Sequence, residues 1–136
     1  MDAKVSILTK QYDENGRLDT IKLDTIANFY SKNNDMYLVY KEDEEGLKTT
    51  TTIKISDEEV SIKRFGNTNS NMVLKKGKSY VTKYRTPQGL FMIETNTKKL
   101  NIDKTVENKL RIDIDYDINV MNFFTGKNKI EITVQM

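Results

Sequence analysis

The chain has 136 residues, the size of one domain, with 22 Lys and Arg against 20 Asp and Glu and a net charge of +2. It has no Cys, His or Trp, which excludes a disulfide framework, a Cys/His zinc site, a thiol nucleophile and an imidazole base. No apolar run approaches the roughly 20 residues that span a bilayer, and MDAKVSIL lacks a signal-peptide layout. We therefore expect one soluble, cytoplasmic domain over residues 1–136.

The composition favours strands over helices. Ile, Val and Thr together number 36, whereas Ala occurs only twice. Branched side chains suit a pleated sheet, while helical domains use Ala heavily. With seven Tyr and five Phe, the inventory predicts an all-β protein.

Apolar and polar residues alternate with period two through the first half of the chain, which predicts strands. Asn15-Gly16 and Asn33-Asn34-Asp35 predict turns, because Asn and Gly tolerate positive φ. We interpret Glu42–Glu45 as a solvated loop and Thr49–Thr52 as ordinary strand. The expected strands cover residues 3–12, 17–31, 36–42, 49–55 and 60–65.

The second half continues this pattern. Thr86-Pro87-Gln88-Gly89 fits a β-turn, with the only proline where its fixed φ is already correct. Residues 101–108 are expected to form an irregular connection or one helical turn. The expected strands cover residues 72–75, 79–85, 90–97, 110–120 and 129–136.

Nine or ten strands joined by short turns form an antiparallel meander. One apolar face per strand must be covered, and the long strands at 17–31 and 110–120 favour closure into a barrel over a sandwich. The predicted fold is therefore all-β, a single antiparallel meander closed into a barrel of about 8–10 strands.

Three stretches carry a family resemblance: Ile62–Gly66 with Met72 after it, Tyr84–Gly89, and Leu110–Tyr116 before the closing strand. Their order resembles the YwiB-like family, a small bacterial family of unknown function, over nearly the whole chain. The resemblance implies a lipocalin-like (calycin) β-barrel. It implies no activity and no site residues.

Arg64 is the first candidate binding residue. It shares strand parity with Val60 and Ile62, so alternation points it inward, where a guanidinium needs partners. Glu94 shares parity with Leu90 and is a candidate partner. Arg64 would then bind an anion inside the barrel; alternatively it bonds backbone carbonyls at a barrel end, or a bulge before Gly66 turns it outward.

A rim site is the second candidate. Tyr84, Arg85 and Thr86 adjoin the proline turn and could lie at a barrel mouth with Arg64. Alternatively the turn only fixes strand register. The residues proposed to bind a ligand are Arg64, Tyr84, Arg85, Thr86, Glu94 and Tyr116. Large side chains expected to point inward are Phe29, Phe65, Met92, Tyr116 and Met121.

Residues 48–85 carry nine basic and three acidic residues. With Tyr80 and Tyr84 interleaved they are similar to a nucleic-acid platform. Pairing with acidic neighbours, or edge lysines that block aggregation, is the alternative explanation.

Asp113, Asp115, Asp117 and Asn119 imitate a calcium loop, but Ile118 stands where Gly is required and Phe124 where Glu is required. We interpret these carboxylates as an outward stripe compensated by Lys127 or Lys129. We expect no metal and no other cofactor.

The leading functional hypothesis is a non-catalytic barrel that binds a small molecule through an interior or rim polar anchor. The alternative is a protein- or nucleic-acid-interaction module that uses the basic outer face of residues 48–85. No catalytic motif in the sequence indicates an enzyme, although a carboxylate-pair hydrolase stays open in principle. It leaves open a protein partner or homodimer, and predicts no membrane partner.

Overall fold

The computed structural model describes residues 1–121 and 123–136. It confirms the all-β prediction, and within these ranges no helix is long and apolar enough to cross a membrane. The strands are β1 (Asp2–Asp13), β2 (Leu18–Lys32), β3 (Asp35–Glu44), β4 (Leu47–Ile55), β5 (Glu59–Gly66), β6 (Ser70–Lys75), β7 (Ser79–Thr86), β8 (Gly89–Asp103), β9 (Lys109–Val120) and β10 (Phe124–Gln135).

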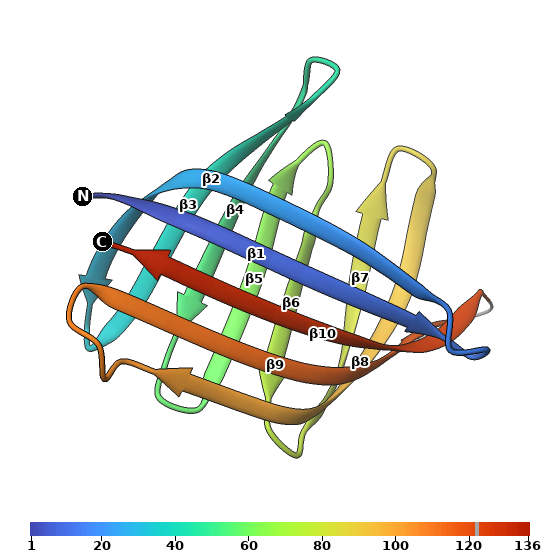
Figure 1. Cartoon of the computed structure of the whole chain (residues 1–136). Coiled ribbons are helices and arrows are strands. Elements are labelled where there is room, and N and C mark those ends of the chain that lie inside the picture. The colour runs from blue at the N-terminus through green and yellow to red at the C-terminus, as the bar shows by residue number, and fades with distance from the viewer. Residues whose placement is uncertain (122) are drawn as a thin grey trace.

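The ten strands form one antiparallel sheet in the order β6-β5-β4-β3-β2-β1-β10-β9-β8-β7. Every strand except the two at the ends of this order therefore pairs with its neighbours along the chain, and β1 pairs with β10 to join the first and last strands. The predicted meander is confirmed, with both termini at the same end of the barrel (Figure 1).

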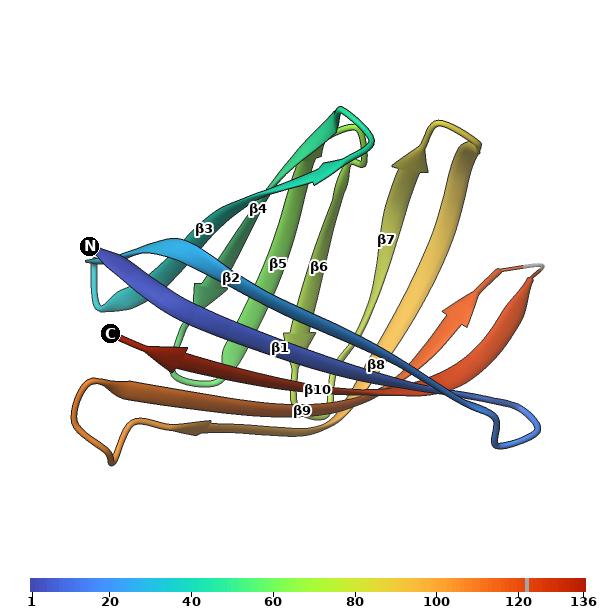
Figure 2. The same ribbon diagram turned by 45° about the horizontal axis from the view of Figure 1, so that its top comes forward.

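The sheet wraps into two layers that cross steeply (Figures 1 and 2). One layer holds β2, β1, β10 and β9, and the other holds β3 to β7. The sheet turns between them at two places. β2 pairs with β3 only over Asn28–Lys32, and β8 passes from β7 to β9 through a register shift between Thr97 and Lys99.

The barrel closes loosely where β6 meets β7. Asn69 and Arg85 form an isolated bridge, with both backbone N–O distances at 2.9 Å. Near it, the Thr82 hydroxyl donates to the Asn71 carbonyl across the seam at 2.8 Å. These contacts stand in place of a continuous ladder of backbone hydrogen bonds between β6 and β7, so the barrel is nearly closed.

The turns follow the predicted chemistry in most places. Asn33 and Asn34 have φ of 54° and 70° and connect β2 to β3, and the proline turn connects β7 to β8. The prediction for residues 101–108 was partly wrong. β8 continues through Asp103, because Ile102 pairs with Ile112 on the buried face and this packing extends the strand.

Gly66 ends β5 beside Arg64 and is required by its geometry. Its φ is +130°, and a Cβ atom added there would lie 2.5 Å from the backbone oxygen of Lys48. Only glycine adopts this conformation without strain and admits so close a neighbouring strand.

We predict that Gly66→Ala destabilises the protein by about 1–3 kcal/mol. The substitution adds a steric clash with β4 to an unfavourable φ. The matched control is Gly77→Ala, whose φ of +78° is also positive but whose Cβ would meet nothing within 4 Å. Urea unfolding of both variants measures the difference, and equal losses would show that the clash with Lys48 is unimportant.

Candidate ligand-binding site

The barrel interior has an apolar half and a polar half. The apolar half lies toward the turns that join β4 to β5 and β8 to β9, and its fully buried side chains include Leu38, Ile53, Val60, Leu74, Leu110, Ile112, Ile114, Ile132 and Val134. One step along the same strands, the inward side chains become polar. We call these the polar belt: Tyr40, Thr51, Arg64, Thr95, Thr97, Tyr116 and Asn128.

Two rows of paired residues build the belt. Tyr40, Thr51 and Arg64 are cross-strand partners on β3, β4 and β5. Thr97, Tyr116 and Asn128 are partners on β8, β9 and β10. Paired residues share a face of the sheet, and Thr51 has no exposed surface. The β4–β5 ladder has no register shift, so Arg64 points inward, the orientation that simple alternation favours and that a bulge before Gly66 would have reversed.

Arg64 joins the two rows. Its positive charge acts on both Tyr40 and Tyr116, which lie in opposite layers. In the described part of the chain, no carboxylate oxygen lies within 4.0 Å of its guanidinium. The interior thus holds a cation without an ion-pair partner.

Both tyrosines of the belt keep their protons. Burial, reinforced by the charge of Glu42 and opposed by that of Arg64, raises the pKa of Tyr40 to about 12. Burial also raises the pKa of Tyr116, although the Asn128 side chain that donates to its hydroxyl at 3.0 Å opposes this shift. Each hydroxyl is therefore neutral at physiological pH and remains a potential hydrogen-bond donor.

A small recess opens above Arg64, among the ends of the β3–β4, β5–β6 and β7–β8 hairpins that stand together at the top of Figure 1. Its volume is about 160 Å³. The lining residues are Glu42, Glu44, Leu47, Thr49, Arg64, Asn67, Thr68 and Tyr84. Arg64 therefore belongs to the polar belt and also lines the recess.

Three buried polar atoms have no hydrogen-bond partner among the described residues: Arg64 Nε, Thr95 Oγ1 and Thr97 Oγ1. All three side chains belong to the polar belt. Leaving such a group unpaired costs about 1–3 kcal/mol, so native interiors rarely tolerate it. The belt consequently has unused hydrogen-bonding capacity.

Comparison with known proteins assigns the chain to a family. The profile of the family described as "Domain of unknown function (DUF1934)" matches residues 5–132. The chain belongs to this family. The uncharacterised β-barrel protein YwiB of Bacillus subtilis (strain 168) is 33% identical over 108 residues, which cover 79% of this chain and 75% of that protein.

The crystal structure of the B. subtilis ywiB protein superimposes with a TM-score of 0.87 at 29% identity. The alignment covers 98% of this chain and 90% of that one. The predicted resemblance to YwiB-like barrels is thereby confirmed. Family membership agrees with the barrel fold and assigns no function.

The six predicted binding residues of this family member do not gather at one place. Arg64 and Tyr84 line the recess, and Tyr116 lies within electrostatic reach of Arg64. Arg85 is exposed and its backbone closes the seam. The Thr86 hydroxyl accepts from the Gln88 amide at 3.1 Å, so Thr86 holds the turn.

The predicted inward orientation of Glu94 was wrong. Glu94 is exposed and pairs with Val81, which is 53% exposed, on the outer face of β7 and β8. Ile93 and Thr95 occupy the buried face instead. Glu94 therefore cannot neutralise Arg64, and it lies in a separate outer groove with Asp117 and Lys127.

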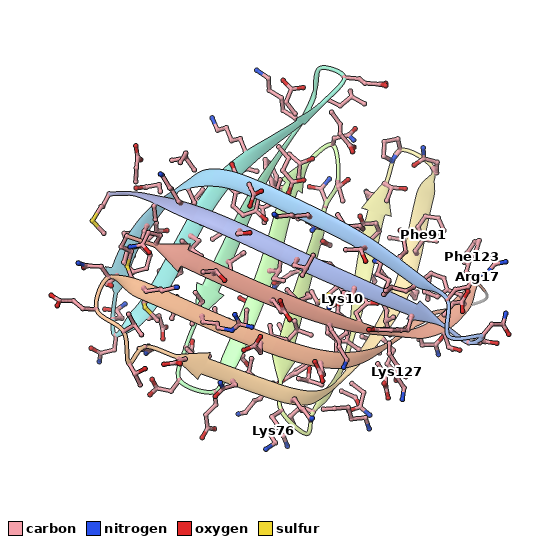
Figure 3. All side chains as sticks on the ribbon, in the orientation of Figure 1. Lys10, Arg17, Lys76, Phe91, Phe123 and Lys127 are labelled. Carbon is pink, nitrogen blue, oxygen red and sulfur yellow. The ribbon has the colours of Figure 1, made fainter. Side chains whose placement is uncertain are left out.

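Other inward predictions also need correction. Phe65 is 70% exposed and Met121 is 37% exposed, while Met92 pairs with the exposed Lys83 on the outer face. Phe29 and Tyr116 do pack inside. Phe91, on the inward parity of β8, lies beside Phe123 with ring centroids 5.1 Å apart (Figure 3).

Sequence reasoning missed Glu42, Glu44 and the threonines of the interior. Glu42 was assigned to a solvated loop, but it lies half-buried on the inward face of β3 and accepts from the Thr51 hydroxyl at 3.2 Å. The available signal was parity, because Thr49 and Thr51 alternate in register with the buried Ile53 and Ile55. Hydroxyls at consecutive inward positions indicate a polar interior.

The aspartate stripe lies beside the two predicted lysines, since Asp115 and Asp117 are in register with Lys129 and Lys127 on β10. Its ion pairs are made with other residues: Asp117 contacts Lys98 at 3.8 Å and Asp113 contacts Arg111 at 3.1 Å. Within the described residues, no cluster of three or more His, Cys, Asp or Glu is arranged to hold a metal ion.

We predict that Tyr40 makes the protein less stable as pH rises above 10. Because the folded pKa is raised to about 12, the folded state keeps a proton that the unfolded chain loses near pH 10. This contribution is fully present below pH 10 and is lost between pH 10 and pH 12, by roughly 2–3 kcal/mol.

Urea unfolding between pH 8 and pH 11 tests this, with Tyr40→Phe expected to flatten the decline. The matched control is Tyr30→Phe, since the Tyr30 ring is 40% exposed on the outer face. An unchanged decline in Tyr40→Phe would contradict the assignment.

Proposed function

We propose that this barrel is a non-catalytic binding protein that holds a small polar ligand at its mouth, with Arg64 as the principal anchor. The observation that carries the proposal is the Arg64 guanidinium at the base of the recess, with a buried Nε that lacks a protein partner. A half-buried arginine with no carboxylate oxygen within 4.0 Å among the described residues is costly unless something else accepts its hydrogen bonds.

Apart from Arg64, the described residues of the polar belt do not line the recess, but they hold further unused hydrogen-bond donors. The Tyr116 hydroxyl accepts from Asn128, so its own proton stays free to be donated. The Thr95 and Thr97 hydroxyls are also unpaired among the described residues. Hydrogen bonds to a charged group in a site with little water are stronger than those between neutral groups.

The same groups argue against catalysis. A general base needs a pKa near the operating pH, whereas burial raises the pKa of both interior tyrosines above their ordinary value. Arg64 does not give up its proton in proteins. The belt is suited to hold a ligand rather than to move protons.

We also propose, from the family resemblance and the composition, a calycin-type barrel in the cytoplasm.

We predict that gently purified protein carries a copurified small molecule. Native mass spectrometry should show an added mass that disappears on denaturation. Arg64→Ala should lose this mass, and Arg64→Lys should retain part of it, because lysine keeps the charge but not the fork of donors.

Leu90→Ala on the outer face is the matched control, since Leu90 is 53% exposed and does not line the recess. Urea unfolding of each variant separates loss of binding from loss of fold. The proposal fails if Arg64→Ala only unfolds the protein, or if it retains the full mass.

The basic outer face supports a second candidate, the binding of single-stranded nucleic acid. Lys63, Lys83 and Arg85 lie on the outer faces of β5 and β7, on either side of β6, and make no ion pair in the described part of the chain. Phe65, on the same outer face, is 70% exposed. Cations beside an exposed ring suit phosphates and stacked bases. Lys54, in contrast, pairs with Asp35 at 3.6 Å.

This candidate predicts salt-sensitive binding of a labelled oligothymidine. The logarithm of the affinity should fall against the logarithm of salt with a slope of about 0.7 per phosphate contacted. Lys63→Glu with Lys83→Glu should abolish binding. Lys4→Glu with Lys22→Glu, on the outer face of the other layer, should not. Binding that survives the first pair would eliminate this face.

A further inference from the structure

The charges that line the recess are of both signs. Among the described residues that line it, Arg64 is the only cation and Glu42 and Glu44 are the two carboxylates. Within the described residues, neither glutamate forms an ion pair. A simple anion would therefore meet two like charges, and a simple cation would meet Arg64.

The strand register orders these charges along the recess. Arg64 belongs to the row with Tyr40 and Thr51, next to the buried interior. Glu42 pairs with Thr49 one row nearer the hairpin end, and Glu44 pairs with Leu47 beyond it. Successive inward residues on a strand are roughly 6–7 Å apart, so the negative charges lie outside the positive one.

The basic side chains of this hairpin do not neutralise these glutamates. Lys48 pairs with Asp43 and Lys41 pairs with Thr50, and both lysines have outward parity. Glu42 is held from below by the Thr51 hydroxyl, which donates to Oε1. Its second oxygen is free to accept from a ligand.

We infer that the ligand of this recess is a small zwitterion whose anionic group contacts Arg64 and whose cationic group contacts Glu42 and Glu44. The inference rests on the proposed binding function and names its ligand class. Each end of such a molecule meets an opposite charge. Leu47 and Tyr84 supply apolar surface for the carbon chain between them.

The volume of the recess narrows the class of ligand further. The recess of about 160 Å³ is small beside ligand pockets of about 300–1,000 Å³. That favours an amino-acid-sized molecule over a nucleotide or a lipid. Because the two charges are in different rows of the sheet, ω-amino acids, whose charges are separated by several bonds, fit better than α-amino acids.

The test is titration calorimetry of the full chain with three probes of similar size: butyrate, butylammonium and 4-aminobutyrate. The zwitterion should bind at least about tenfold more tightly than either singly charged probe, because only the zwitterion avoids juxtaposed like charges. A series from glycine to 6-aminohexanoate should show an optimum at an intermediate length.

Variants assign the two ends. Glu42→Gln with Glu44→Gln should weaken 4-aminobutyrate about tenfold and strengthen butyrate, since the repulsion is removed. Glu45→Gln is the matched control, because Glu45 is exposed at the tip of the same hairpin and does not line the recess. Arg64→Ala should weaken both butyrate and 4-aminobutyrate.

The outcomes separate this inference from the proposed function. Butyrate binding as tightly as 4-aminobutyrate, and through Arg64, would overturn the zwitterion and leave the binding function in place. Failure of the whole amino-acid series to bind would overturn the zwitterion as well. If no copurified mass depends on Arg64 either, the binding function falls with it.

Discussion

Closure of the sheet on itself is the constraint on which the rest of this structure depends. Ten strands with one apolar face each can bury that face only if the two outermost strands meet. Here β6 and β7 meet through one backbone bridge, between Asn69 and Arg85, and through the Thr82 hydroxyl. The seam is held mainly by the packing of inward side chains on both sides of it, so the contents of the interior bear directly on the stability of the closed form.

The inward side chains change from apolar to polar halfway along the barrel. Thr51, Thr95 and Thr97 in the belt are as fully buried as Ile53 and Ile114 in the apolar half. Each hydroxyl adds a donor and two acceptors that an aliphatic interior would not need. Together with Arg64, they make the mouth end polar while the far end remains an ordinary core.

The sequence predicted the strands well because alternation is strong where only one face is apolar. It left the orientation of Arg64 open, because one bulge would have reversed it, and the uninterrupted β4–β5 ladder decides for the interior. It misplaced Glu94 because β8 carries apolar residues on both faces, Leu90 and Met92 on one and Phe91 and Ile93 on the other. Only the pairing with β7 and β9 decides which face is buried. Phe65 is a different case, because its parity is opposite to that of Val60, Ile62 and Arg64 and alternation along β5 already places it on the outer face. The recess joins residues of four strands, β3, β4, β5 and β7, with the β5–β6 loop, a proximity that no local pattern contains.

The pairing of β1 with β10 affects the order in which the barrel can form during synthesis. The first and the last twelve-residue strands are hydrogen-bonded neighbours in the middle of the sheet. A chain emerging from the ribosome can form its hairpins one after another, but β1 keeps an unpaired edge until β10 has been synthesised and has left the ribosome. Completion of the barrel therefore waits for β10. Until then the nascent chain carries an apolar strand open to pairing with other chains.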